Sequence, residues 1–275
     1  MTLFDDLRIY MAANARASLA LGSAEVVIVG ESHGFLKSNA AAIRTTAMTR
    51  VVRELLNDPR FRYFGNESFQ NAGPVRQAIR DYWLRSVLPP EFDGAAPGAA
   101  AMDAQEAGRR VMPRRFQPVL DDLRARPRYV LSIGSRSNGD IRDRRIAQHI
   151  FEEVADRGMT PHTPGVLLLG AAHAAATSFS MGQTTTRMIL ERHGYRCTSI
   201  FVMTDFTASG RSDDSVFPLA SGRPPGTRLA GLTLPSPVSF NTRLAGSPFF
   251  RVRAEFSDSG RSIAEQYEFV VLHRA

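Results

Sequence analysis

Two stretches of the sequence end in the same Gly-x-x-His pattern: Val26-Val27-Ile28-Val29-Gly30-Glu31-Ser32-His33 and Val166-Leu167-Leu168-Leu169-Gly170-Ala171-Ala172-His173. In each, a short run of β-branched and aliphatic residues stops at a glycine, which is typical of a buried strand. Ligands of open α/β sheets bind in the crevice beyond the carboxyl ends of the strands. The matched positions therefore predict that His33 and His173 reach one cleft, although they lie far apart in the chain.

The other apolar segments alternate with helical patterns. We expect strands at 25–29, 61–65, 129–134, 166–169 and 198–203, and helices at 3–21, 38–57, 74–86, 104–126, 141–157 and 180–193. This alternation predicts an α/β fold with a mostly parallel open sheet and helices on both faces. The active-site crevice is then expected at the C-terminal ends of the strands.

The C-terminal part of the chain has a different composition. Residues 207–247 are rich in Gly, Pro and Ser, whereas 249–256 and 267–273 are strand-like. We interpret 207–247 as an irregular excursion with short β pieces, a lid or a substrate wall, after which the chain adds an edge strand. A length of 275 residues is ample for one core, so residues 1–275 are interpreted as a single domain.

The charge of the chain restricts the expected partners. The formal net charge is +7, and Lys37 is the only lysine, so almost all positive charge is arginine. An arginine excess can indicate nucleic acid or an anionic substrate, but we favour a biased overall composition as its explanation. Because no nucleic-acid-binding motif occurs, we expect a small-molecule substrate and no nucleic acid, and the sequence leaves the oligomeric state open.

Membrane and disulfide signals are missing from the sequence. No apolar run approaches the roughly 20 residues that span a bilayer, and Asp5 and Asp6 interrupt any leader-like segment, so we expect a cytoplasmic protein without membrane association. Cys197 is the sole cysteine, which excludes an intrachain disulfide. Its strand-like surroundings favour a buried small side chain over a nucleophile.

Five polar residues are expected at the carboxyl ends of the strands or at the start of the following helix. They are Glu31, His33, Glu67, His173 and Arg142. A neutral imidazole can take a proton from water near pH 7, and an adjacent carboxylate stabilises the imidazolium that forms. An arginine can stabilise a developing oxyanion. These five residues are therefore the predicted catalytic site.

Several of these residues also have a structural explanation when they are taken alone. Glu67 could cap the next helix, and Arg142 could form a surface salt bridge. The remaining histidines are expected to be structural: His149, His162, His193 and His273.

Four short motifs occur along the chain in this order: Gly30-Glu31-Ser32-His33-Gly34, Asn66-Glu67-Ser68, Arg142-Asp143-Arg144-Arg145-Ile146-Ala147 and Gly170-Ala171-Ala172-His173. In order and position they resemble the erythromycin esterase/ChaN/TIKI superfamily. The resemblance spans about 25–204 and the last ten residues, whereas 207–265 has no clear counterpart.

The resemblance implies several activities. Erythromycin esterases hydrolyse a macrolactone with a histidine base and no required metal, TIKI-like members are metal-dependent peptidases, and ChaN-like members bind haem. By resemblance, His33 is the base that activates water, Glu31 and Glu67 are its supporting carboxylates, His173 is the second essential histidine, and Arg142 stabilises an anion.

Some positions depart from the family pattern. The spacing from Glu31 to His33 is the shorter ChaN/TIKI form, the arginine expected on the first helix is at best Arg44, and a lipobox cysteine is missing. His33, His173 and Glu67 would make a two-His, one-carboxylate zinc set, but no independent metal motif supports it. The metal question stays open, and we expect no cofactor.

The sequence therefore predicts a hydrolase-like enzyme that cleaves an ester, lactone or related acyl bond with histidine-activated water, a natural product being one candidate substrate. The alternatives are a TIKI-like metallopeptidase, a ChaN-like haem or small-molecule binding protein, and a biosynthetic enzyme that uses the same base for cyclisation or elimination.

Overall fold

The computed structural model describes residues 3–16, 19, 21, 23–31, 51–71, 76, 129–135, 137, 139–178, 183–203, 205–208, 216–219, 238–252 and 261–272. Among these residues, no helix is both apolar enough and long enough to cross a membrane.

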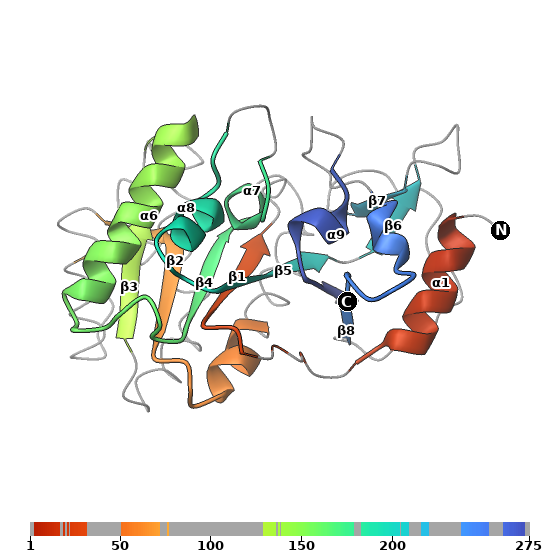
Figure 1. The fold of residues 1–275 in the computed structure, drawn as a ribbon, viewed down its shortest axis with the longest axis horizontal. Helices are drawn as coiled ribbons and strands as arrows, with labels where there is room; N and C mark the ends of the chain where they lie inside the picture. The colour runs from red at the N-terminus through yellow and green to blue at the C-terminus, as the bar shows by residue number, and fades with distance from the viewer. Residues whose placement is uncertain are drawn as a thin grey trace, which may run out of the picture.

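The described strands form an open seven-stranded sheet in the order β3-β2-β4-β1-β5-β9-β8 (Figure 1). Their bounds are β1 Val26–Glu31, β2 Tyr63–Gln70, β3 Tyr129–Gly134, β4 Gly165–Gly170, β5 Cys197–Met203, β8 Val238–Asn241 and β9 Phe269–Leu272. All neighbouring strands run parallel except β8 and β9, which are antiparallel. The predicted α/β fold with a mostly parallel open sheet is confirmed.

Helices and a small ribbon complete the described structure. The helices are α1 Leu3–Asn14, α6 Gly139–Ala155, α7 Ala171–Ala174, α8 Thr186–Arg192, the 3-10 helix η3 Pro248–Phe250 and α9 Ile263–Gln266. Residues 51–57 are also helical. β6 (Asp205–Ala208) and β7 (Val216–Leu219) pair antiparallel in a sheet of their own.

Helices cover both faces of the sheet, as the sequence predicts (Figure 1). Because successive strand residues point to opposite faces, the wholly apolar start of β1 serves two cores. Ile28 belongs to the cluster that contains Ile150 of α6. Val29 belongs to the cluster that contains Leu55 of the helical segment 51–57. The two clusters lie on opposite faces and are each almost fully buried.

The strand register places the carboxyl ends of β1, β2 and β4 at the same edge of the sheet. Glu31 pairs with Gly170 where β1 and β4 end side by side, and Asn66 of β2 pairs with Leu168. Glu67 and the start of α7 therefore lie at the same edge of the sheet, which is where the sequence places the crevice.

Two sequence-based expectations on the position of helix and strand ends need correction. α1 ends at Asn14 instead of residue 21, because Arg16 forms a bridge with Ser239. β2 continues to Gln70, so Glu67 lies within the strand and not after it. The pairing of β2 with β3 shifts register between Asn66 and Gln70, and this irregularity hides the strand's true end from a simple apolar pattern.

The C-terminal expectations are partly wrong. A strand at 249–256 does not form over the described residues up to Val252: Pro248 starts a 3-10 helix whose first turn is capped by the Ser247 side chain. The last strand, β9, lies inside the sheet, and β8 is the edge strand. Most of the helices expected at 74–86 and 38–57, all of 104–126 and most of 207–237 lie outside the described residues.

Candidate functional site

His173 is held close to the sheet by the short helix α7, which begins directly after β4. Ala171 and Ala174 of α7 are buried in the core, and the hydroxyl of Tyr267 donates a hydrogen bond to the Ala171 carbonyl at 2.8 Å. Small residues and this hydrogen bond let the helix lie against β1 and β4. The His173 side chain is consequently only 12% exposed.

Asp143 of α6 binds the His173 ring. Its Oδ1 lies 2.8 Å from His173 Nδ1 and also accepts hydrogen bonds from the backbone N–H of Thr186 at 2.6 Å and from the Thr186 hydroxyl at 2.7 Å. The Asp143 side chain is 13% exposed. Because an ionised carboxylate can only accept, the proton between the two side chains belongs to His173 Nδ1. Asp143 thus fixes both the orientation and the tautomer of the imidazole.

Glu67 and Arg142 lie on the other side of the ring. Glu67 Oε2 is 4.0 Å from His173 Nε2, and Glu67 Oε1 is 3.5 Å from an Arg142 guanidinium nitrogen (Nη2). The Glu67 side chain is 6% exposed. Nε of Arg142 is buried and has no hydrogen-bond partner among the described residues. A nearly buried carboxylate and imidazole therefore meet a partly exposed guanidinium, and their charges interact more strongly than they would in water.

The local charges favour the protonated form of His173. Burial lowers the pKa of this imidazole, but the hydrogen bond from its ring to Asp143 and the negative charges of Glu67 and Asp143 raise it, against a smaller opposing effect of Arg142. The net result is a pKa above the ordinary value for histidine. Such a perturbed group at the carboxyl end of a parallel sheet is typical of an acid–base site.

Gly134, the last residue of β3, makes room for the irregular part of β2. A Cβ at this position would lie 2.1 Å from the Glu67 carbonyl oxygen and 3.0 Å from that of Phe69. No side chain fits there without moving the backbone that carries Glu67. The glycine therefore sets where the Glu67 carboxylate stands.

The structure brings together three of the five predicted site residues: Glu67, Arg142 and His173. Glu31 ends β1, but its side chain lies outside the described part of the chain, as does all of His33. How these two residues complete the site stays a prediction.

Sequence reasoning missed Asp143 and Thr186. Asp143 follows Arg142 directly in a motif that the sequence analysis singled out, so its position was the available signal. Thr186 carries no such signal, because its contact with Asp143 depends on how α6 and α8 pack.

The contacts of the three described histidines outside the site are those expected of structural residues. His149 Nδ1 lies 3.2 Å from the Ile133 carbonyl, His162 pairs with Glu25, and the His193 ring packs on Phe151 at 4.6 Å. His273 lies outside the described residues.

Cys197 lies in β5, as the sequence predicts, and is partly buried against the core. Burial raises the pKa of its thiol, so the nucleophilic thiolate is disfavoured.

The described residues do not form a metal-binding cluster. In the described ranges, no group of three or more His, Cys, Asp or Glu side chains is arranged to hold a metal ion. Of the two-His, one-carboxylate set considered from the sequence, these ranges contain His173 and Glu67 but not His33.

Comparisons with known proteins show a similar fold in solved structures but no related protein of known activity. No family model and no curated protein matches the sequence. The fold is similar to the crystal structure of a Bacillus cereus protein, with a TM-score of 0.55 and 12% identity over 98% of this chain and 97% of that chain. It is also similar to the crystal structure of a succinoglycan biosynthesis protein, with a TM-score of 0.51 and 10% identity over 98% and 96% of the two chains. At such low identity these similarities show a shared fold alone.

Proposed function

We propose that the protein is a hydrolase-like enzyme that cleaves an ester, lactone or related acyl bond with histidine-activated water. The observation that carries the proposal is the Asp143–His173 pair, whose ring lies between two carboxylates beside Arg142 at the carboxyl end of the sheet. A ring that is oriented through Nδ1 and largely buried is prepared for proton transfer at Nε2.

The electrostatics favour His173 as the general acid. Its pKa is raised above the ordinary histidine value, so the imidazolium persists to higher pH than in an ordinary histidine, and its Nε2–H can protonate the oxygen that leaves the acyl carbon. Arg142 supports the reaction by stabilising the negative charge that develops on the carbonyl oxygen. The part of the base, which takes a proton from the attacking water, falls to His33 by resemblance.

The proposal is tested with purified protein and a panel of aryl esters, simple lactones and macrolactones. We expect turnover of at least one substrate, and a loss of roughly 10²- to 10⁴-fold in kcat for His173→Gln. Since the acid must be protonated, kcat should also fall as the pH rises through the raised pKa of His173. His193→Gln is the matched control and should keep full activity, because the His193 ring packs on Phe151 and takes no part in the proposed proton transfer.

Two results would count against the proposal. Activity that survives both His173→Gln and His33→Ala would remove the assigned proton-transfer residues. Activity on peptides that a chelator abolishes and Zn²⁺ restores would favour the metallopeptidase alternative.

A further inference from the structure

The first turn of α8 is bonded to three different parts of the fold by three consecutive residues. The Thr185 hydroxyl donates to the Ala175 carbonyl at 2.8 Å, just after α7. Thr186 binds Asp143 of α6, and Arg187 binds Glu268, which directly precedes β9. The sequence Thr185-Thr186-Arg187 thus links the helix that carries His173 to the helix that carries Asp143 and to the sheet.

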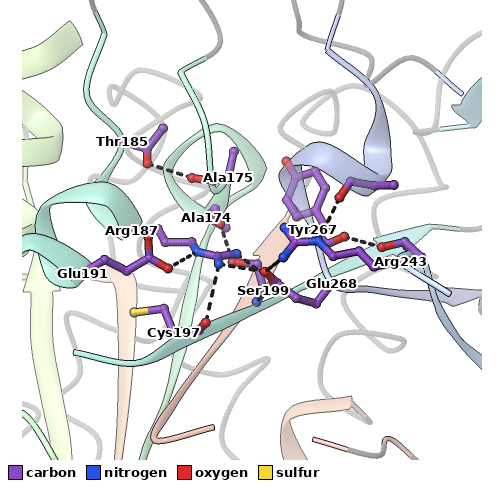
Figure 2. A network of polar contacts seen from close by, with 12 residues as sticks. Ala174, Ala175, Thr185, Arg187, Glu191, Cys197, Ser199, Arg243, Tyr267 and Glu268 are labelled. Atoms are coloured by element: carbon purple, nitrogen blue, oxygen red, sulfur yellow. Dashed lines mark hydrogen bonds and ion pairs between the residues drawn. The ribbon is translucent and has the colours of Figure 1, made fainter. Parts of the chain in front are cut away.

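Arg187 is the anchor of this turn (Figure 2). Its guanidinium donates to both oxygens of Glu268 at 2.7 and 2.8 Å and to Glu191 at 2.9 Å, although the residue is only 4% exposed. Glu268 also accepts the backbone N–H of Ser199 at 2.7 Å and pairs with Arg243 at 2.7 Å. A fork-shaped pair with this many partners has little freedom to rotate, so it fixes α8 relative to β5 and β9.

Thr186 lies next to Arg187 in α8, so the anchored helix also fixes the position of Thr186. Thr186 is fully buried, and its N–H and hydroxyl both donate to Asp143 Oδ1, the same oxygen that lies 2.8 Å from His173 Nδ1. Two donors from one rigid residue hold the carboxylate in a single orientation. Without the hydroxyl, one of these donors is lost in a place that is nearly closed to water.

We propose that Thr186 is a positioning residue, which acts on His173 through Asp143 and is itself held in place by the Arg187–Glu268 pair. The hydroxyl stabilises the ionised carboxylate and keeps it aimed at Nδ1. The groups that then decide the charge of the imidazole are Asp143 and Glu67, which favour the cation, and Arg142, which opposes it.

The test follows the imidazole of His173 by NMR titration of the full chain, with the signal assigned by its loss in His173→Gln. Thr186→Val removes the hydroxyl and should move the titration midpoint to lower pH, because burial then acts against a weaker hydrogen bond. Thr186→Ser restores a hydroxyl and should restore the midpoint. Thr184→Val is the matched control: Thr184 is half-buried, and among the described residues no hydrogen bond of its side chain is found.

A second set of variants guards against misfolding. Thr186→Ala removes the same hydroxyl without adding a methyl group against the carboxylate, so it replaces Thr186→Val if that variant fails to fold. Arg187→Lys keeps the charge but loses the fork, and it should also lower the midpoint. A folded Thr186→Val or Thr186→Ala variant with the wild-type midpoint would overturn the inference.

The inference and the proposed function fail separately. The titration needs no substrate, so the shift can occur in a protein that hydrolyses nothing. Where a substrate is found, Thr186→Val should lower kcat by roughly 2- to 10-fold, as expected for one hydrogen bond, and Thr184→Val should not.

Discussion

Gly134 illustrates how a single residue can set the geometry of the site. Since a Cβ there would meet the Glu67 carbonyl oxygen at 2.1 Å, Gly134→Ala forces β2 and β3 apart. We expect a loss of about 1–3 kcal/mol in the free energy of unfolding, the usual cost of overpacking, together with reduced activity as Glu67 moves. Denaturant unfolding and the hydrolysis assay measure the two effects.

Gly158 provides the control for this substitution. It has a φ of +65° just after α6, and an added Cβ would meet nothing within 4 Å. Gly158→Ala should therefore cost about 1–2 kcal/mol through backbone strain alone and leave activity unchanged. Equal activity in both variants would show that Gly134 does not position Glu67.

At the scale of an element, the helix α8 also depends on a single residue, Thr185, for its stability. Thr185 caps its N-terminus: its hydroxyl oxygen accepts the N–H of Met188 at 3.1 Å while the hydroxyl donates to Ala175. Thr185→Ala loses both bonds in a buried place, so we expect a cost of about 1–2 kcal/mol in thermal or denaturant unfolding. Thr184→Ala, one residue earlier, should change stability by less than about 0.5 kcal/mol. Similar losses in the two variants would exclude the capping role.

The strands were predictable where apolar runs end at turn residues. β3 is observed at the predicted residues, and β5 begins one residue earlier than predicted. β2 was misplaced because its irregular continuation carries polar residues, and 249–256 was misread because Pro248 and the Ser247 cap favour a 3-10 turn over a strand. The local apolar pattern predicts that a strand is present. Where a strand such as β2 ends, or whether Pro248 starts a turn instead, depends on strand register and on capping side chains.

The site was predictable in part for the same reason. Glu67 and His173 follow from the rule that parallel strands end at one edge of the sheet. Thr186 does not, because its contact with Asp143 joins residues 43 positions apart on two helices. Such a contact depends on how the helices pack, which no local spacing reveals.

At the scale of the whole molecule, the two ends of the chain stabilise the same region. Tyr10 of α1 donates a hydrogen bond to the Asn241 carbonyl of β8 at 2.6 Å, and β8 pairs with the last strand, β9. β9 in turn pairs with β5 inside the sheet. Glu268, just before β9, therefore lies where α8, β5 and the residues around Arg243 meet (Figure 2).

Because of this position, substitutions in the Arg187–Glu268 pair can test how strongly it holds α8 to β5 and β9. Its side chains are 5% and 16% exposed, whereas those of the Arg261–Glu265 pair are 50% and 37% exposed. Removing one partner of the buried pair, as in Arg187→Met or Glu268→Gln, should cost about 1–3 kcal/mol, because the remaining charge stays buried and keeps only its second partner, Arg243 for Glu268 or Glu191 for Arg187. Double-mutant cycles should give a coupling energy of about 1–3 kcal/mol for the buried pair and about 0.3–0.5 kcal/mol for Arg261 and Glu265. If the two cycles agreed, the buried pair would be no more than a local contact, and α8 would be held to the sheet by its apolar packing alone.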